Sequence, residues 1–204
     1  MKTLLLTALL IPQLVFAADN LGEVGKKRTQ QFIDLLMKVK QAEGGKALSK
    51  ADQDANAKIF SELDEIFDWD YLINEPVRTR LDKFSPAEKT EFLKKFKEVI
   101  RLVAYPDSGS FFRKAKWQIG DAKDVTADKV TVAIQAKKDD LETQVDLHFH
   151  MMGSSLKLYD ASFDGDSLVK DYQNQMVRIV DKGGAKELIS KIDKRKAELE
   201  KPKK

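Results

Sequence analysis

One cluster of potential metal ligands in the sequence is LYDASFDGDSLVKD, residues 158–171, which places four aspartates around one glycine. Against the template of a calcium-binding EF-hand loop, Asp160 falls at position 1 and Asp171 at the closing position 12. Such a loop lies between two helices and closes with a glutamate. Here the residues before Asp160 alternate as in a strand, and the closing residue is an aspartate inside a helical pattern. We therefore do not expect a calcium site.

The same segment has the composition of a turn that joins a strand to a helix. Asp164-Gly165 suits a tight turn because both residue types tolerate a positive φ. Asp166 or Ser167 can cap a helix that begins at Leu168. We expect a strand–turn–helix joint at this point of the chain.

The two histidines of the sequence, His148 and His150, lie on one face of a predicted strand with Asp146 beside them. Zinc could use this spacing. That face is opposite to Leu147 and Phe149, however, so it is the solvent side of a half-buried strand, and no third ligand is obvious. We favour a solvated strand face. A secreted metal-dependent enzyme that uses His148, His150 and Asp146 stays as the alternative.

Other catalytic patterns find no support in the sequence. There is no cysteine, which excludes disulfides, thiolate metal sites and cysteine nucleophiles. Neither a G-x-S-x-G elbow nor a glycine-rich phosphate loop occurs. The two carboxylates of FDWD, Asp68 and Asp70, point to different sides of a helix, so a shared acid–base role is not expected. The sequence therefore predicts no enzyme and no cofactor.

The N-terminus carries a predicted signal peptide over residues 1–17. A short cationic start, Met1-Lys2-Thr3, precedes the apolar run LLLTALLI, and Ala17 stands at a plausible cleavage site. The net charge of +3 becomes +2 once Lys2 is removed, with charges of both signs at high density. This balance argues against a nucleic-acid partner.

Apolar residues recur at helical spacing over residues 25–40, and again after Ser49 and after Ser85. Ser49 with Asp52 resembles a capping box, and Ser85-Pro86-Ala87-Glu88 combines an N-cap, a proline at N1 and a glutamate at N3. We expect three amphipathic helices. Their apolar faces carry Phe32, Leu35, Leu36 and Val39, then Ile59, Phe60, Leu63, Ile66 and Phe67, then Phe92, Phe96, Val99, Ile100 and Val103.

The segment YPDSGS, residues 105–110, is predicted to end this helical half, because the apolar period then changes to two. Four alternating sets follow, which predicts an antiparallel meander of four strands. The sets are Phe111, Ala115, Trp117 and Ile119, then Val130, Val132, Ile134 and Ala136, then Val145, Leu147, Phe149 and Met151, then Leu156 and Leu158.

The helical period returns after Asp166, breaks at Gly183-Gly184, and continues into a lysine-rich end. We expect one α+β domain over residues 18–193, with helices on one face of a curved four-stranded sheet, followed by a basic tail over residues 194–204. We favour a solvated tail. The alternative is a tail that steers the chain to anionic headgroups or partners through Lys194, Arg195, Lys196, Lys201, Lys203 and Lys204.

Three segments of the sequence resemble the MlaC family of periplasmic phospholipid carriers, also called toluene-tolerance proteins. IFDWDYL, residues 66–72, is similar to that family's F-D-F-x-x-M-A helix. SPAEKTEFLKKF, residues 85–96, is similar to its T-P-E-Q-x-x-x-F-x-x-x-F segment. LKLYDASFDGDSLVKDYQNQMVRIVDKGGAKELISKI, which begins at Leu156, is similar to its strand W-K-[IV]-Y-D-V-x-I-D-G-V-S-L-V-x-N-Y-R-x-Q-F and the helix after it.

The resemblance implies a carrier in the periplasm of a Gram-negative bacterium, without enzymatic activity and with phospholipid as its cargo. The carrier would move lipid between an outer-membrane lipoprotein complex and an inner-membrane ABC transporter that has an MCE-domain subunit, and it is expected as a monomer. A diverged adaptor whose pocket is closed remains possible on the same resemblance.

The predicted lipid-binding residues are the apolar side chains that face the expected cavity between the sheet and the helices. They are Phe67, Trp69, Leu72, Phe92, Phe96, Ile100, Val132, Ile134, Leu147, Phe149, Leu158, Leu168, Tyr172 and Met176. Periodicity alone does not distinguish a filled core from a hollow one.

Overall fold

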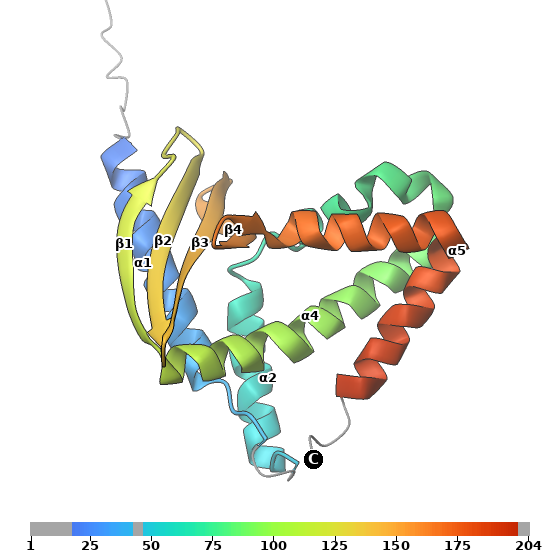
Figure 1. The fold of residues 1–204 in the computed structure, drawn as a ribbon, viewed down its shortest axis with the longest axis horizontal. Coiled ribbons are helices and arrows are strands. Elements are labelled where there is room, and N and C mark those ends of the chain that lie inside the picture. The colour runs from blue at the N-terminus through green and yellow to red at the C-terminus, as the bar shows by residue number, and fades with distance from the viewer. Residues whose placement is uncertain (1–17, 43–46, 200–204) are drawn as a thin grey trace, which may run out of the picture.

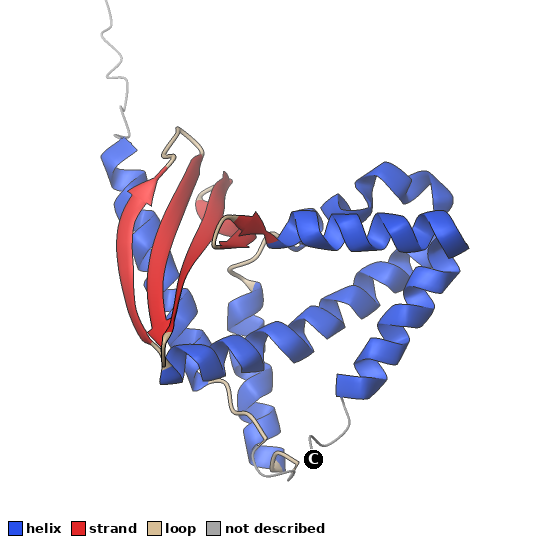
Figure 2. Ribbon diagram, in the orientation of Figure 1, coloured by secondary structure: helices blue, strands red, loops and turns tan. Residues whose placement is uncertain are grey.

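A computed structural model of the chain describes residues 18–42 and 47–199 (Figure 1). The predicted signal peptide, residues 1–17, lies outside the described residues. The elements follow the order α1 (Ala18–Lys38), α2 (Lys50–Asp64), α3 (Trp69–Asn74), a 3₁₀ helix η1 (Glu75–Lys83), α4 (Pro86–Lys114), β1 (Lys116–Lys123), β2 (Lys129–Lys138), β3 (Leu141–Met152), β4 (Ser155–Phe163), β5 (Asp166–Ser167) and α5 (Leu168–Leu199). Figure 2 shows that the strands form one sheet at one end of the molecule and that helices make up the other end.

Two helices begin as the sequence predicts. The Ser49 side chain accepts a hydrogen bond from the Asp52 backbone N–H at 3.1 Å and caps α2. At α4, Ser85 accepts from the Glu88 N–H while the Glu88 carboxylate accepts from the Ser85 N–H, which completes a capping box. Each cap satisfies backbone donors that a helix leaves without partners at its start.

The prediction that YPDSGS ends the third helix is wrong, because α4 continues through Pro106 to Lys114. A proline removes one helical hydrogen bond, but tertiary contacts hold the helix together here. Tyr105 is fully buried, and Gly109 lies so close to the Leu36 carbonyl oxygen that a Cβ would come within 2.2 Å of it. Phe111 therefore belongs to the helix and not to a strand.

The sheet is antiparallel in the order β1-β2-β3-β4-β5, so it has five strands where the sequence predicted four. The fifth strand contains two residues and extends the β4 edge. Phe149 pairs with Val130 on β2 and with Leu158 on β4, and Leu147 pairs with Val132 and Ala161. These residues share one face of the sheet, which α1 covers. The α+β fold class is confirmed.

The strand–turn–helix joint also forms as predicted. Asp164 and Gly165 have φ values of 50° and 94° and make the turn between β4 and β5. Ser167 caps α5 by accepting from the Lys170 N–H at 3.1 Å. The Asp160 carboxylate accepts from the Ser167 hydroxyl and from the Val169 N–H, so it ties the end of the sheet to the first turn of the helix.

Buried side chains gather in two separate groups. The sheet core joins the covered face of the sheet to α1, α2 and the second half of α4. The helical core joins α3, η1, the first half of α4 and α5. Figure 1 shows the two regions at opposite ends of the molecule, with α4 running from one to the other. Trp69 packs against both cores.

Helix α5 bends at Gly184, which has a φ of 75°, and then continues to Leu199. Residues 194–199 of the expected tail are thus the last part of helix α5. Within this part, Lys196 forms an ion pair with Glu98 of α4 at 2.7 Å. Lys201, Lys203 and Lys204 lie outside the described residues. Across residues 18–42 and 47–199, no helix combines the length and apolar character needed to cross a bilayer.

Candidate functional site

The structure divides the predicted lipid-binding residues between the two cores instead of placing them on the walls of one space. Val132, Ile134, Leu147, Phe149 and Leu158 are buried in the sheet core, and Phe67 packs against it half-buried. Phe92, Phe96 and Met176 are buried in the helical core, where Ile100 and Tyr172 are half-buried. Leu72 is buried and Leu168 half-buried, both outside the two cores.

The two cores meet at a junction that we define by Phe67, Trp69, Ile100, Ala104 and Tyr172. The Phe67 and Trp69 rings are 5.1 Å apart. Ile100 packs against the helical core, whereas Ala104, one turn later on α4, packs against the sheet core. All five side chains are only partly buried. Apolar surface therefore remains partly uncovered between the two cores.

Helix α4 shows the same incomplete burial along its middle. Phe96 is 3 % exposed and Tyr105 is fully buried, yet none of the residues 97–104 between them is buried. Five of these eight residues are apolar: Val99, Ile100, Leu102, Val103 and Ala104. Val103 continues the helical face of Phe92, Phe96 and Val99 but belongs to neither core. Val99, Ile100, Val103 and Ala104 of this stretch are the candidate lining of an apolar binding site, whereas Leu102 is exposed.

Of this stretch, the sequence predicts only Ile100 as a lipid-binding residue. Val103 belongs to a predicted apolar helical face. Its spacing continues that of the buried residues before it, so the spacing alone does not show that Val103 is less buried. Only the burial pattern distinguishes the two parts of the face.

A charged cluster borders the junction. The Asp64 carboxylate is paired with the Arg101 guanidinium, lies 3.4 Å from the Lys97 ammonium and accepts from the Tyr105 hydroxyl at 2.8 Å. Burial raises the pKa of Tyr105 well above its ordinary value, and loss of hydration lowers the pKa of Lys97. The Lys97 ammonium also lies 4.5 Å from the centre of the Trp69 ring, a cation–π distance.

The Trp69 indole N–H is a buried donor without a hydrogen-bond partner among the residues that the structure describes. A buried donor left without an acceptor costs roughly 1–3 kcal/mol. A bound molecule with an acceptor oxygen at the junction would recover this energy. The arrangement therefore combines partly uncovered apolar side chains with one available polar donor.

The histidine pair does not form a site with Asp146. His148 lies between the hydroxyls of Thr131 and Ser162, at 3.0 Å and 2.7 Å, and His150 Nε2 lies 2.8 Å from Asp68 Oδ2. The Asp146 carboxylate instead accepts from the Gln144 amide. Within the described parts of the chain, no group of three or more histidine, cysteine, aspartate or glutamate side chains could hold a metal ion.

The expectation of a solvated strand face also needs correction, because both histidines are only partly exposed. Tyr159 and Tyr71 cover them, with ring centres 5.0 Å and 6.3 Å from His150. Asp68, which His150 contacts, also caps α3 by accepting from the Tyr71 N–H, whereas Asp70 is exposed. The two carboxylates of FDWD therefore point apart, as predicted.

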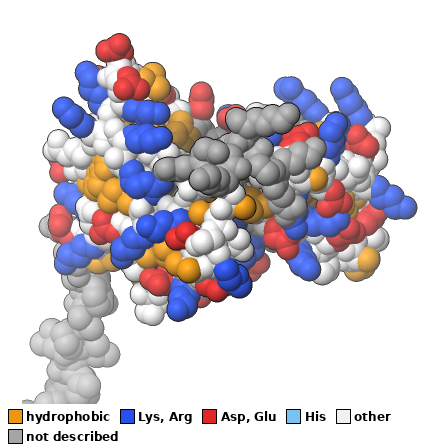
Figure 3. Space-filling view, turned by 90° about the horizontal axis from the view of Figure 1, so that it is seen from below, with side chains coloured by type: hydrophobic (Ala, Val, Ile, Leu, Met, Phe, Trp, Pro, Cys, Tyr) orange, Lys and Arg blue, Asp and Glu red, His pale blue; other side chains and the backbone are white. Residues whose placement is uncertain are grey.

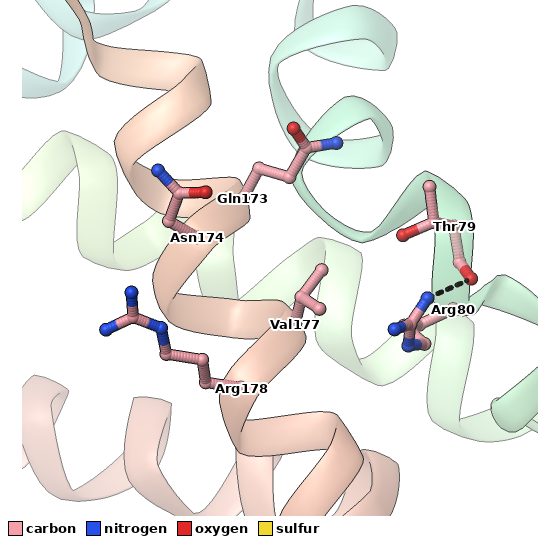
Figure 4. Close-up of a pocket in the computed structure, with 6 residues that line it drawn as sticks. All are labelled: Thr79, Arg80, Gln173, Asn174, Val177 and Arg178. Atoms are coloured by element: carbon pink, nitrogen blue, oxygen red, sulfur yellow. Dashed lines mark hydrogen bonds between the residues drawn. The ribbon is translucent and has the colours of Figure 1, made fainter.

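A shallow hollow of about 360 Å³ lies on the outside of the helical core, between η1 and α5 (Figure 4). Its lining residues are Thr79, Arg80, Gln173, Asn174, Val177 and Arg178. Figure 3 shows the molecule from below, where apolar side chains appear in separate small groups among charged ones. Five of the six residues that line the hollow have polar or charged side chains, and none of the six belongs to the junction.

Among known proteins, the chain is similar to solved structures and to one protein family. No curated protein sequence matches it. A solved structure with a similar fold is the phospholipid-binding protein from Ralstonia solanacearum in complex with a phospholipid, at 16 % sequence identity and a TM-score of 0.68. The match covers 86 % of this chain and 98 % of the other. At this identity the likeness concerns the fold.

The sequence profile of the MlaC protein family matches residues 29–194, which include every described element from the second half of α1 to most of α5. This match confirms the resemblance seen in the sequence: the chain belongs to the MlaC family.

Proposed function

We propose that the protein is a phospholipid carrier that holds acyl chains between its two cores. The observation that carries the proposal is the stretch 97–104 of α4, where five apolar residues remain partly uncovered in the middle of the molecule. Membership in the MlaC family and a fold shared with a phospholipid-binding protein support the same function. The predicted lipid-binding residues on both cores would flank the bound chains.

Helix α4 runs from one core to the other and Trp69 packs against both, so the acyl chains would enter by separating the cores along the junction. The indole N–H of Trp69, which has no partner within the described residues, would donate to an ester carbonyl of the lipid. Lys97, stacked on the same indole, would keep the ring in place. The carrier would thereby hold the apolar chains and one polar group of the lipid.

We infer that the carrier is exported to the periplasm and exchanges lipid with complexes at both membranes, as the family membership and the predicted signal peptide suggest. Two acyl chains with roughly 28 methylene groups, at about 0.8 kcal/mol each, gain on the order of 20 kcal/mol relative to water. A bilayer offers the same gain. Transfer should therefore take place by contact with an outer-membrane lipoprotein complex and an inner-membrane ABC transporter, while exchange through water is slow.

The first test is the lipid content of the protein purified from the periplasm, measured by extraction and mass spectrometry. We expect phospholipid in roughly stoichiometric amount. Protein that is folded and free of phospholipid would overturn the carrier function.

Val103→Trp locates the cargo. Its indole would occupy the room of about three methylene groups at the uncovered face of α4, so phospholipid retention should fall on the order of tenfold or more. Leu102→Trp is the matched control, because Leu102 is the neighbouring residue, is 36 % exposed and points to another side of the helix. Equal lipid content in the two variants would show that this face of α4 does not hold the chains.

An adaptor with a closed pocket is a second candidate, and one observation favours it. Nine of the fourteen predicted lipid-binding residues are buried against protein. An adaptor would co-purify without phospholipid and would still bind the partner complexes, so the same lipid extraction separates the two functions.

A further inference from the structure

The two ends of the molecule carry opposite net charge. We define the helical lobe as residues 69–97 and 168–199, and the sheet lobe as the remaining described residues. The helical lobe has fifteen basic and ten acidic residues, a net charge of +5. The sheet lobe has sixteen basic and twenty-one acidic residues, a net charge of −5. The near-neutral total therefore conceals a charge separation along the molecule, which orients it in an electric field.

Part of the positive charge forms a regular stripe on the first half of α5. Lys170, Asn174, Arg178 and Lys182 recur every four residues, share one helical face and are all exposed. Lys170, Arg178 and Lys182 form no ion pair with any described residue. Their charges are therefore available to an outside partner.

The hollow between η1 and α5 lies directly beside this stripe. Figure 4 shows Asn174 and Arg178 one turn apart on α5, while Gln173 and Val177 point toward Thr79 and Arg80 on η1. The Arg80 guanidinium is held by Asp181 through two hydrogen bonds of 2.6 Å and 2.9 Å. Lys83 contacts the same carboxylate, and these two cations hold the pKa of Asp181 far below its ordinary value. One carboxylate thus faces two cations, and Figure 4 shows the Arg178 guanidinium on the side of α5 turned away from Arg80.

The chemistry of the hollow suits a phosphate group. The Gln173 amide and the Thr79 hydroxyl offer donors between α5 and η1, while the Asn174 amide and the Arg178 guanidinium lie at the edge of the hollow, on the side of α5 turned away from η1 (Figure 4). A guanidinium matches phosphate oxygens in a planar fork. A volume of about 360 Å³ exceeds that of a single phosphate and leaves room for the glycerol beside it. No acidic side chain lines it.

We propose that the α5 stripe is the membrane-docking surface of the protein, which lies on an anionic phospholipid bilayer with one lipid phosphate in the hollow beside Arg178. The negative sheet lobe is repelled by the same surface, so the molecule approaches with its helical lobe first. This inference rests on the proposed carrier function and adds to it the face that meets the membrane.

The test is vesicle binding by the full mature chain. Wild-type protein should bind vesicles of 70 % phosphatidylcholine and 30 % phosphatidylglycerol at low salt and dissociate from them at high salt. It should not bind vesicles of pure phosphatidylcholine. Each positive charge removed from the contact should weaken binding about fivefold, so K170Q/R178Q/K182Q should lose on the order of a hundredfold. Circular dichroism checks that the variant is folded.

The matched control removes three exposed charges from the sheet lobe, K58Q/K116Q/K123Q, and has the same net charge as the stripe variant. It should keep wild-type binding. Equal losses in both variants would mean that net charge alone attracts the protein, which overturns the docking surface. The docking surface would also be overturned if wild-type protein bound anionic and neutral vesicles equally. That result would instead favour an acidic protein as the partner of the stripe.

Arg178→Lys separates the hollow from the stripe, because it keeps the charge but removes the planar fork. A phosphate seated in the hollow predicts a clear loss of binding in Arg178→Lys, and unchanged binding would overturn that part of the proposal. Lipid extraction from each variant distinguishes the two failures. Loss of vesicle binding with cargo retained concerns docking, whereas absence of cargo from the wild type concerns the carrier function.

Discussion

The sheet core and the helical core are both filled with aliphatic and aromatic side chains, yet the backbone contributes to them in different ways. In the sheet core, residues such as Phe149 are fixed on both sides by paired strands. In the helical core, side chains and ion pairs alone connect separate helices, for example Lys95 of α4 with Asp193 of α5 at 2.6 Å. The proposed site between the cores would open by a shift of the helical core, while the strand pairing of the sheet core stays intact.

The largest expected effect comes from truncating one phenylalanine in each core. Phe149 and Phe92 are both fully buried, so Phe149→Ala and Phe92→Ala should each lower the free energy of unfolding by about 3–5 kcal/mol. Trp117 lies in the sheet and Trp69 at the junction, and these are the two tryptophans of the chain. Their fluorescence in Trp69→Phe and Trp117→Phe backgrounds reports each region separately during urea unfolding.

If the cores differ as described, Phe149→Ala should shift the unfolding midpoint seen by both tryptophans. Phe92→Ala should shift the midpoint of Trp69 first and leave that of Trp117 closer to the wild type. Identical midpoints at both tryptophans in Phe92→Ala would mean that the molecule unfolds as a single unit and would remove the basis of the comparison.

A smaller effect is expected where α4 crosses α1. Gly109→Ala places a Cβ against the Leu36 carbonyl oxygen and should lower the free energy of unfolding by about 1–3 kcal/mol. Gly120→Ala on β1 is the control, since its nearest neighbour would be the Ala133 carbonyl oxygen at 3.4 Å. Thermal unfolding of both variants measures the difference. A Gly109→Ala variant as stable as Gly120→Ala would show that α4 does not depend on this close approach.

The smallest effect concerns one tyrosine in each core: Tyr105 is buried and Tyr172 is half-buried. Tyr105→Phe removes the hydrogen bond to Asp64 and should lower the free energy of unfolding by about 1 kcal/mol at pH 7. Burial raises the pKa of Tyr105, and also that of Tyr172 in the helical core. The stability from each protonated tyrosine is fully present below its unfolded pKa of about 10 and is lost above it, because the unfolded state releases the proton first.

Between pH 10 and 11.5, wild-type protein should therefore lose stability faster than Tyr105→Phe, by up to about 1.4 kcal/mol per pH unit. Tyr172→Phe should reduce the same loss in the helical core. Urea unfolding at several pH values measures both slopes. Parallel slopes in wild type and Tyr105→Phe would contradict the burial-raised pKa.

Local chemistry was predictable from the sequence, and long-range contacts were not. Ser49, Ser85 and Ser167 cap their helices as expected, because a cap depends on neighbours within a few residues. The alternation of apolar and polar residues along each strand likewise predicted which face of the sheet is covered, because this alternation depends only on neighbouring residues. The sequence around Pro106 predicts the end of a helix, but α4 continues through it. The continuation packs closely against Leu36, which is distant in the sequence, at Gly109.

The candidate site shows the same division. The apolar residues around it were recognisable by period, but their separation into two cores depends on how α4 crosses the molecule. The unburied stretch 97–104 has the same period as the buried residues before it, so only the packing reveals it. Neither the pairing of Asp64 with Arg101 nor that of Asp68 with His150 leaves any signal in a single sequence.

The backbone pairing of residues 66–68 with β4 has a consequence for solubility. The Asp68 N–H donates to the Leu158 carbonyl and the Leu158 N–H donates to the Ile66 carbonyl, so this edge of the sheet is occupied by the chain itself. At the other edge, β1 carries Lys116 and Lys123 and an irregular pairing between Ile119 and Ala122. Charges and irregular pairing hinder the addition of a further strand. If the junction opens for cargo as proposed, apolar side chains would come into contact with water while the β4 edge stays paired, which would hinder β-aggregation of the open form.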